Sequence, residues 1–68
     1  MPYASNQQLP PVLQTRLPEH AQDIYRGAFN AAYQRYGAID EARLHRIAWS
    51  AVKRVYERVA GQWVRRDH

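Results

Sequence analysis

Apolar side chains recur at helical spacing in two long stretches of the chain. Between residues 18 and 36 they fall three and four positions apart, which places them on one face of a helix. Pro18 at the first position and Gly37 just past the last turn are typical start and stop signals. The pattern therefore predicts a long helix over residues 18–36. Its buried face is expected to contain Ala21, Ile24, Tyr25, Ala28, Phe29, Ala32, Tyr33 and Tyr36.

A second stretch, over residues 40–60, has the same spacing. Asp40 and Glu41 place negative charge at the positive end of a helix, and Gly61 suits the left-handed conformation that often follows a helix end. These signals predict a second long helix from about 40 to 60. Its expected buried residues are Leu44, Ile47, Ala48, Ala51, Val52, Val55 and Val59.

A short helix is expected before the two long ones. Pro10 and Pro11 fit the first turn of a helix, and the residue before Pro18 is pushed away from helical geometry. The predicted helix covers about residues 10–16. Its expected core contacts are Val12, Leu13 and Leu17.

The expected architecture is mainly α-helical, in one domain that spans 1–68. A chain of this length buries only about 60% of its unfolded surface, so it has room for one core. Residues 37–39 form so short a link that the two long helices should be antiparallel neighbours. Trp49 and Tyr56 widen the apolar face of the last helix, so another element has to cover them. We expect this cover from the N-terminal segment and the tail 61–68, with a minimal two-stranded ribbon between the termini as one form of it.

The composition indicates how the fold is stabilised and where the protein is located. Cysteine is absent, so neither disulfides nor a thiolate zinc site can replace helix packing. No run reaches the roughly 20 apolar residues that a membrane-spanning helix needs. Met1, Pro2 and Tyr3 lack the basic and apolar stretches of a secretory signal. We expect a cytoplasmic protein that does not insert into a membrane.

Two strings of residues are more particular than helical periodicity requires. They are His-Ala-Gln-Asp-Ile-Tyr at 20–25 and Ala-Trp-Ser-Ala-Val-Lys at 48–53. Together with Leu9-Pro10, Leu17-Pro18-Glu19 and the Trp63 that precedes basic residues, they make the chain resemble the ChaB family over nearly its whole length. The resemblance implies a small helical domain with minor strand content and no catalytic residue. It also implies a part in regulating sodium or calcium/proton antiporters.

The chain departs from this family in the link between its two long helices. The familiar bacterial form has a longer, acid-rich insertion there, whereas here the stretch has shrunk to residues 37–41. A role of that insertion in sensing cations is therefore not carried over to this chain.

The acids and histidines do not form a recognisable reactive site. Glu41 and His45 are four residues apart, which is an ordinary pairing on a helix surface, and a zinc site needs three or four converging ligands. His20 and His68 have no second His and no carboxylate four residues away. The sequence also lacks a glycine-rich phosphate loop. It therefore predicts no catalytic residue, no metal site, no cofactor and no small-molecule substrate.

The basic residues carry the clearest functional signal. The formal net charge is +4, with ten Lys and Arg against six Asp and Glu. Several of the cations fall on the side of the last helix opposite its apolar face. This side is either a solvated surface or a contact for an acidic protein, for nucleic-acid phosphates, or for an anionic lipid surface by charge alone. The candidate binding face consists of Arg43, Arg46, Lys53, Arg54, Arg58, Arg65 and Arg66.

A second candidate lies on the polar side of the first long helix. Asp23, Arg26 and Asn30 line up there at helical spacing. Asn30 either bonds to the N-terminal segment or belongs with the other two to a protein-contact stripe.

The function expected from the sequence is that of a small non-enzymatic regulatory protein. It would act through contacts with a protein partner, such as a cation antiporter. The alternative is an accessory protein that binds nucleic acid without sequence preference through the basic side of the last helix. The sequence leaves the oligomeric state open.

Overall fold

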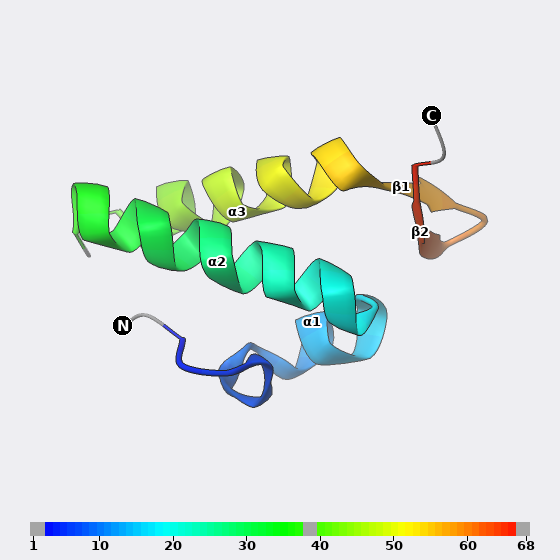
Figure 1. The fold of residues 1–68 in the computed structure, drawn as a ribbon, viewed down its shortest axis with the longest axis horizontal. Helices are drawn as coiled ribbons and strands as arrows, with labels where there is room; N and C mark the ends of the chain where they lie inside the picture. Colours follow the sequence, from blue (N-terminus) through cyan, green and yellow to red (C-terminus); the bar gives the residue numbers. More distant parts are fainter. Residues whose placement is uncertain (1–2, 38–39, 67–68) are drawn as a thin grey trace.

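Two long helices lie side by side and run in opposite directions, with the other elements packed around them (Figure 1). The computed structural model describes residues 3–37 and 40–66. The expected fold class is confirmed: mainly helical, with a short helix, two long helices and a two-stranded ribbon. In chain order the elements are the 3-10 helix η1 (Asn6–Gln8), the helices α1 (Pro11–Arg16), α2 (Glu19–Tyr36) and α3 (Glu41–Val55), and the strands β1 (Tyr56–Val59) and β2 (Gln62–Arg65).

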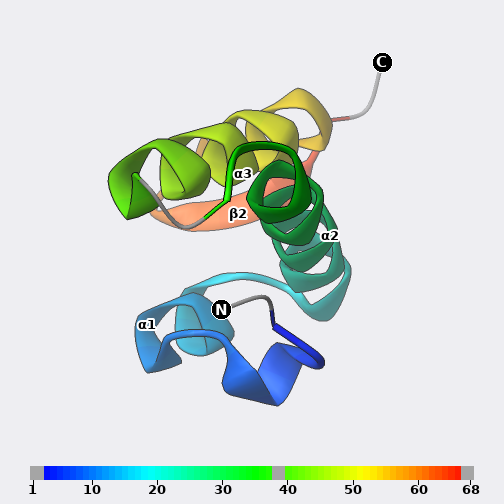
Figure 2. The same ribbon diagram turned by 90° about the vertical axis from the view of Figure 1, so that its left-hand side faces the viewer.

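Helix α2 is the central element of the fold. The N-terminal elements η1 and α1 lie on one side of it and α3 lies on the other (Figures 1 and 2). Tyr25 and Phe29 of α2 are 1% and 2% exposed. Ala21 and Ala48, both fully buried, let the two backbones approach closely. The core consists of Leu9, Leu13, Leu17, Ala21, Tyr25, Phe29, Ala32, Leu44, Ala48, Val52 and Tyr56.

Three residues expected in the core are exposed. Val12 is 53% exposed, because Leu9, Leu13 and Leu17 are spaced four apart and turn one side of the N-terminal segment inward while Val12 points away. Tyr36 is 41% exposed at the last turn of α2, and Val59 is 49% exposed in β1. For these positions the prediction from spacing was wrong.

Gln22 is a buried residue that the apolar pattern did not indicate. Its side chain is 9% exposed and faces the end of α1. Its Nε2 donates to the backbone oxygens of Leu17 at 2.9 Å and Gln14 at 3.2 Å. These bonds satisfy carbonyls that the end of a short helix leaves without partners.

The last helix is shorter than predicted. Helix α3 ends at Val55 rather than near Ala60, because Tyr56 adopts extended geometry and begins strand β1. A continued helix would not return the chain to Trp49. The strand instead buries Tyr56 to 5% exposure, and the returning strand brings the Trp63 ring to 5.4 Å from the Trp49 ring. The wide apolar flank of α3 is thereby covered.

The two-stranded ribbon forms within the C-terminal part of the chain. Strands β1 and β2 are antiparallel, with Tyr56 opposite Arg65 and Val59 opposite Gln62. The expected pairing between the two termini was wrong, because a link of only Ala60 and Gly61 lets adjacent segments pair at a lower loop cost. The N-terminal segment lies along α2 instead.

The hairpin turn requires backbone geometry that is unusual for alanine. Ala60 and Gly61 have φ of 52° and 81°, so both central residues are left-handed, as in a type I′ turn. Gly61 was correctly expected to be left-handed, but it belongs to this turn and does not cap a helix.

Within the described parts of the chain, no helix combines the length and the apolar character needed to cross a bilayer.

Replacing Ala60 with Asn is predicted to stabilise the protein. Asn tolerates the left-handed conformation better than Ala does, and relieving this strain should raise the free energy of unfolding by about 1 kcal/mol. Urea unfolding followed by circular dichroism measures the change. The control is Ala42→Asn on the exposed side of α3, which should lower stability by a few tenths of a kcal/mol because Asn is a poorer helix former. Equal effects at the two positions would contradict the turn assignment.

Candidate interaction surface

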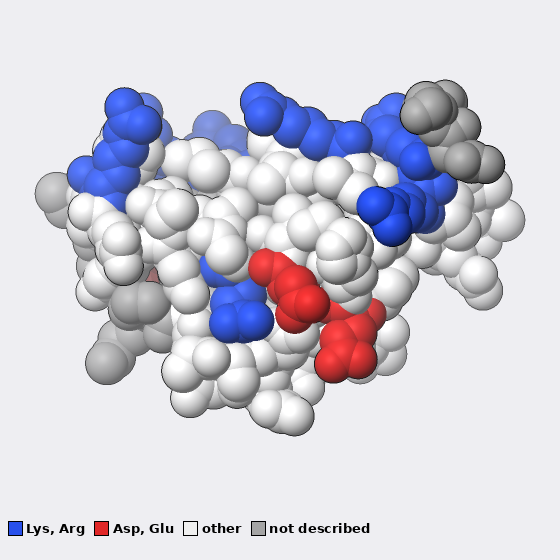
Figure 3. All heavy atoms as spheres, viewed as in Figure 1, with Lys and Arg blue, Asp and Glu red and all other residues white. Residues whose placement is uncertain are grey.

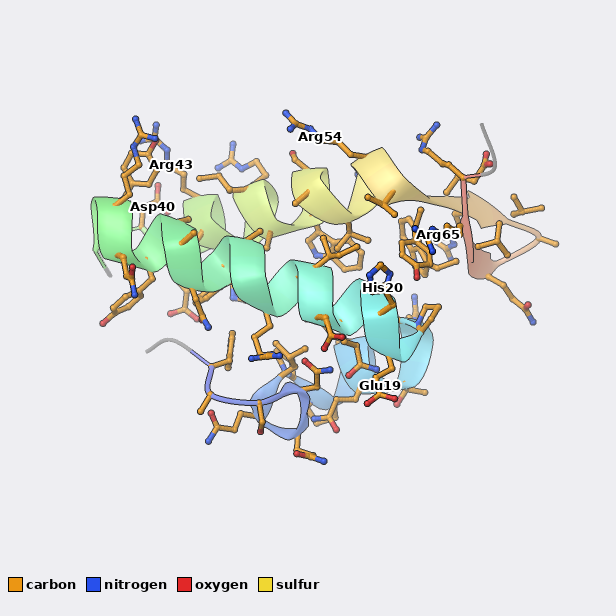
Figure 4. All side chains as sticks on the ribbon, viewed as in Figure 1. Glu19, His20, Asp40, Arg43, Arg54 and Arg65 are labelled. Atoms are coloured by element: carbon orange, nitrogen blue, oxygen red, sulfur yellow. The ribbon has the colours of Figure 1, made fainter. Side chains whose placement is uncertain are left out.

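The seven basic residues of the candidate binding face are all exposed. Figure 3 shows most of the visible Lys and Arg along the edge that α3 and the hairpin form, whereas the carboxylates on this side lie below it, next to a single basic group. Arg43 and Arg54 point outward along this edge (Figure 4). We call this set, Arg43, Arg46, Lys53, Arg54, Arg58, Arg65 and Arg66, the basic surface.

Helix α3 supplies the first part of the basic surface. Its start is fixed by Asp40, whose Oδ1 accepts a hydrogen bond from the Arg43 backbone N–H at 3.2 Å. The Arg43 guanidinium lies over the Tyr36 ring, 4.9 Å from its centre, which holds this side chain against the end of α2. Arg43 and Arg46 border a shallow hollow of about 240 Å³ with Ile47 and Ser50.

The hairpin supplies the second part. Paired residues share a face of a ribbon, so Arg58 lies beside Trp63, and Arg65 beside Tyr56, on the face that packs on the helices. Arg66 connects the hairpin to the end of α3 by two hydrogen bonds. Its backbone N–H donates to the Val55 oxygen at 2.7 Å and its Nε donates to the Lys53 oxygen at 2.9 Å.

The basic surface is not neutralised by the chain itself. In the segments 3–37 and 40–66, the ion pairs join Arg26 to Asp23 and His45 to Glu41, each at 3.6 Å, and neither includes a residue of the basic surface. Within these segments, no carboxylate therefore competes with the anions of a partner for the basic surface.

The two helical histidines make structural contacts. His20 Nδ1 lies 3.1 Å from the Tyr56 hydroxyl, which joins α2 to the hairpin. His45 Nδ1 is hydrogen-bonded to the Tyr25 hydroxyl, and its ring lies 4.9 Å from the Phe29 ring. Among the residues that the structure describes, no three His, Cys, Asp or Glu side chains converge on a point where a metal ion could bind. His68 lies outside the described residues.

The stripe of Asp23, Arg26 and Asn30 is occupied by the chain's own N-terminal segment. Asn30 Oδ1 accepts from the Tyr3 N–H and Asn30 Nδ2 donates to the Tyr3 oxygen, both at 2.8 Å. Asn6 donates to Asp23 Oδ1 at 2.7 Å and accepts from Arg26 Nε at 2.8 Å. Of the two expectations for Asn30, the bond to the N-terminal segment is the one observed.

One cation that sequence patterns did not single out lies near the basic surface. Arg16, in the last turn of α1, borders the same hollow as Lys53 and Arg58. Since α1 and the hairpin are far apart in the chain, no local signal could have indicated this neighbourhood.

Comparison with known proteins identifies the family. The ChaB family model matches residues 9–66. The chain belongs to the ChaB family. A protein of Escherichia coli strain K12 described as "Putative cation transport regulator ChaB" is 42% identical over 64 residues, covering 82% of this chain and 84% of that protein. A Shigella flexneri protein with the same description matches equally well.

A solved ChaB structure shares the fold. The NMR solution structure of a "putative cation transport regulator ChaB" matches with a TM-score of 0.81 and 36% identity, covering 97% of this chain and all of that one. The helical class and the small ribbon are thus features that this chain shares with a solved ChaB protein.

Loss of the Asn30 side chain is predicted to release the N-terminal segment. Asn30→Ala removes two partly buried hydrogen bonds to the Tyr3 backbone and should lower the free energy of unfolding by about 1–2 kcal/mol. Hydrogen exchange of the Tyr3 amide should accelerate. Gln34→Ala, at an exposed position of the same helix, is the control and should change stability by less than about 0.5 kcal/mol. Unchanged exchange at Tyr3 would show that the two bonds do not hold the segment.

Burial of Tyr25 is predicted to make the fold sensitive to alkali. Burial raises the pKa of Tyr25 from 10.0 to about 12, and the nearby Tyr3 acts in the same direction. Between these pH values the unfolded chain loses the proton while the folded chain keeps it, so stability is full below pH 10 and falls as pH rises toward 12. The expected loss is roughly 2–3 kcal/mol.

Urea unfolding from pH 8 to 12 tests this expectation. Tyr25→Phe should flatten the alkaline fall, although it also costs about 1 kcal/mol at neutral pH because His45 loses its partner. The exposed Tyr36 provides the control variant Tyr36→Phe, which should keep the fall. An equally steep fall in Tyr25→Phe would assign the alkaline transition to other groups.

Proposed function

We propose that this ChaB protein is a non-enzymatic regulator that acts in the cytoplasm by binding an acidic surface of a partner protein. The supporting observation is the basic surface: seven exposed cations on α3 and on the hairpin segment that follows it, none of them paired with a carboxylate of residues 3–37 or 40–66. The description of the relatives as cation transport regulators supports a cation antiporter as the partner.

The basic surface has the properties that such binding needs. Arginine binds carboxylates with two parallel hydrogen bonds, which fixes orientation as well as charge. The net charge of +4 speeds the approach to an acidic partner. The hydrogen bonds of Arg66 to Lys53 and Val55 join the hairpin segment to the end of α3, beside the cations of that helix.

A second candidate function is nonspecific binding of nucleic acid. Arg43, Arg46 and Arg54 follow one another along the exposed side of a single helix, an arrangement that suits a row of phosphates. Each neutralised phosphate releases counterions, so this binding would weaken steeply between about 50 and 200 mM salt.

The test of the regulatory function is the effect of the protein on antiport. Membrane vesicles from the source cell are assayed for cation-driven collapse of a pH gradient, with and without the added protein. Wild-type protein is expected to change the rate. The variant Arg43→Gln, Arg46→Gln, Arg54→Gln should lose most of the effect, because it removes three of the four cations that α3 contributes to the basic surface.

A variant of equal net charge is the control. Ala4→Glu, Gln7→Glu, Gln34→Glu also lowers the net charge of +4 by three, at exposed positions outside α3 and the hairpin, and should keep the effect. Both variants should remain folded, since exposed substitutions change stability by about 0.5 kcal/mol or less each, and circular dichroism checks this. If wild-type protein leaves antiport unchanged while duplex DNA is shifted in a salt-dependent manner, the second function replaces the first.

A further inference from the structure

A groove runs between α1 and the hairpin. In Figure 2, β2 passes beneath α3 on the same side of α2 as α1. Two adjoining hollows of about 340 and 610 Å³ make up the groove, and both are bordered by Arg16, Arg58 and Trp63. It is thus a continuous depression on the surface rather than a gap filled by side chains.

The floor of the smaller hollow is apolar. Val12, Leu13, Trp49 and Trp63 line the smaller hollow. Leu13 belongs to the core, but Val12 is 53% exposed, which is more than any other large apolar side chain that the structure describes. Trp63 is half-buried, and its ring packs against the ring of Trp49. The chain therefore leaves apolar surface at this point that it does not cover itself, and tryptophan and arginine are the residues most often found at the energetic centres of protein interfaces.

The rim of the groove is basic. Arg16, Lys53 and Arg58 border the smaller hollow, and neither hollow is lined by a carboxylate. Glu57 belongs to the opposite face of the ribbon from Arg58, because side chains alternate along a strand. The negative charge that this rim attracts has to come from the occupant.

We infer that the groove binds a short acidic peptide segment of the partner, with one large apolar side chain on the Val12 and Trp63 floor and carboxylates on Arg16, Lys53 and Arg58. The groove adjoins the basic surface described above, and Lys53 and Arg58 belong to both, so its role rests on the proposed function.

Other occupants fit the groove less well. A second copy of this chain also carries a net charge of +4, so it would be repelled. A phosphate backbone gains nothing from an apolar floor of Val12 and Leu13. A base could stack only on the free side of Trp63, since its ring already lies 5.4 Å from that of Trp49. An acidic peptide with an apolar anchor uses both the floor and the rim.

Peptide binding to the full chain tests the inference. The probe is a short peptide of Glu and Gly residues with one central Phe, and the comparison peptide has Gly at the centre. Both tryptophans of the chain line the groove, so intrinsic fluorescence reports the binding. The Phe peptide is expected to bind at least about tenfold more tightly than the Gly peptide.

Variants locate the site. Arg16→Glu should weaken binding of the Phe peptide at least about tenfold. Arg35→Glu is the matched control, because Arg35 is also exposed in the last turn of a helix but lies outside the groove, and it should keep the affinity within about threefold. Val12→Ser should remove most of the preference for Phe over Gly. All three positions are exposed, so the fold should persist, and circular dichroism confirms it.

Several results would overturn the inference. One is equal binding of the Phe and Gly peptides, or equal effects of the Arg16 and Arg35 variants. Another is that neither peptide binds up to about 1 mM. A third is that a single-stranded oligonucleotide, followed by the same tryptophan fluorescence, binds more tightly than the Phe peptide. The vesicle assay separates this failure from that of the proposed function. If Arg16→Glu leaves the effect on antiport intact while the α3 variant abolishes it, the groove is excluded and the regulatory function stands.

Discussion

The burial of Tyr25 and Phe29 in the middle of α2 is the contact on which the rest of the structure depends. From these two rings a chain of aromatic contacts reaches the N-terminal segment, α3 and the hairpin. Phe29 lies 4.9 Å from Tyr3 in the N-terminal segment, and Tyr25 lies 5.5 Å from Trp49 in α3. Trp49 in turn lies 5.4 Å from Trp63 in the hairpin. The chain has no cysteine, so no disulfide can stabilise the fold. Large rings that contact several elements at once supply apolar burial in its place.

The same contacts determine where charge can be displayed. Because α2 is covered by the N-terminal segment on one side and by α3 on another, its polar residues Asp23, Arg26 and Asn30 are engaged within the molecule. No segment of residues 3–37 or 40–66 covers the exposed side of α3, and the hairpin that packs on Trp49 adds further arginines beyond the end of that helix. Packing of the apolar residues thus produces the uneven surface charge, with cations on α3 and the hairpin, that favours an acidic partner.

The hairpin has two roles that a longer helix would not combine. It covers the wide apolar flank of α3, and it forms one wall of the groove that faces α1. Both depend on the reversal at Ala60 and Gly61, where both residues have positive φ. A helix continued to Ala60 would leave Trp49 without Trp63 and would carry Arg58 away from Arg16. The short turn is therefore a requirement of the surface as well as of the core.

The sequence alone determined the helical class, the start and end of α2, the start of α3 and the exposed cations of α3, because helical spacing and terminal residues act over a few neighbouring positions. It also named the N-terminal segment as one of two alternatives for the contact of Asn30, and the structure shows that one. Only the tertiary structure decided where α3 ends and which segments pair in the ribbon. It also decided that Gln22 is buried and that Arg16 lies near Arg58. The apolar spacing of residues 56–59 is compatible with either a helix or a strand. The strand is chosen because it lets Trp63 cover Trp49, and local patterns within 56–59 do not include this contact.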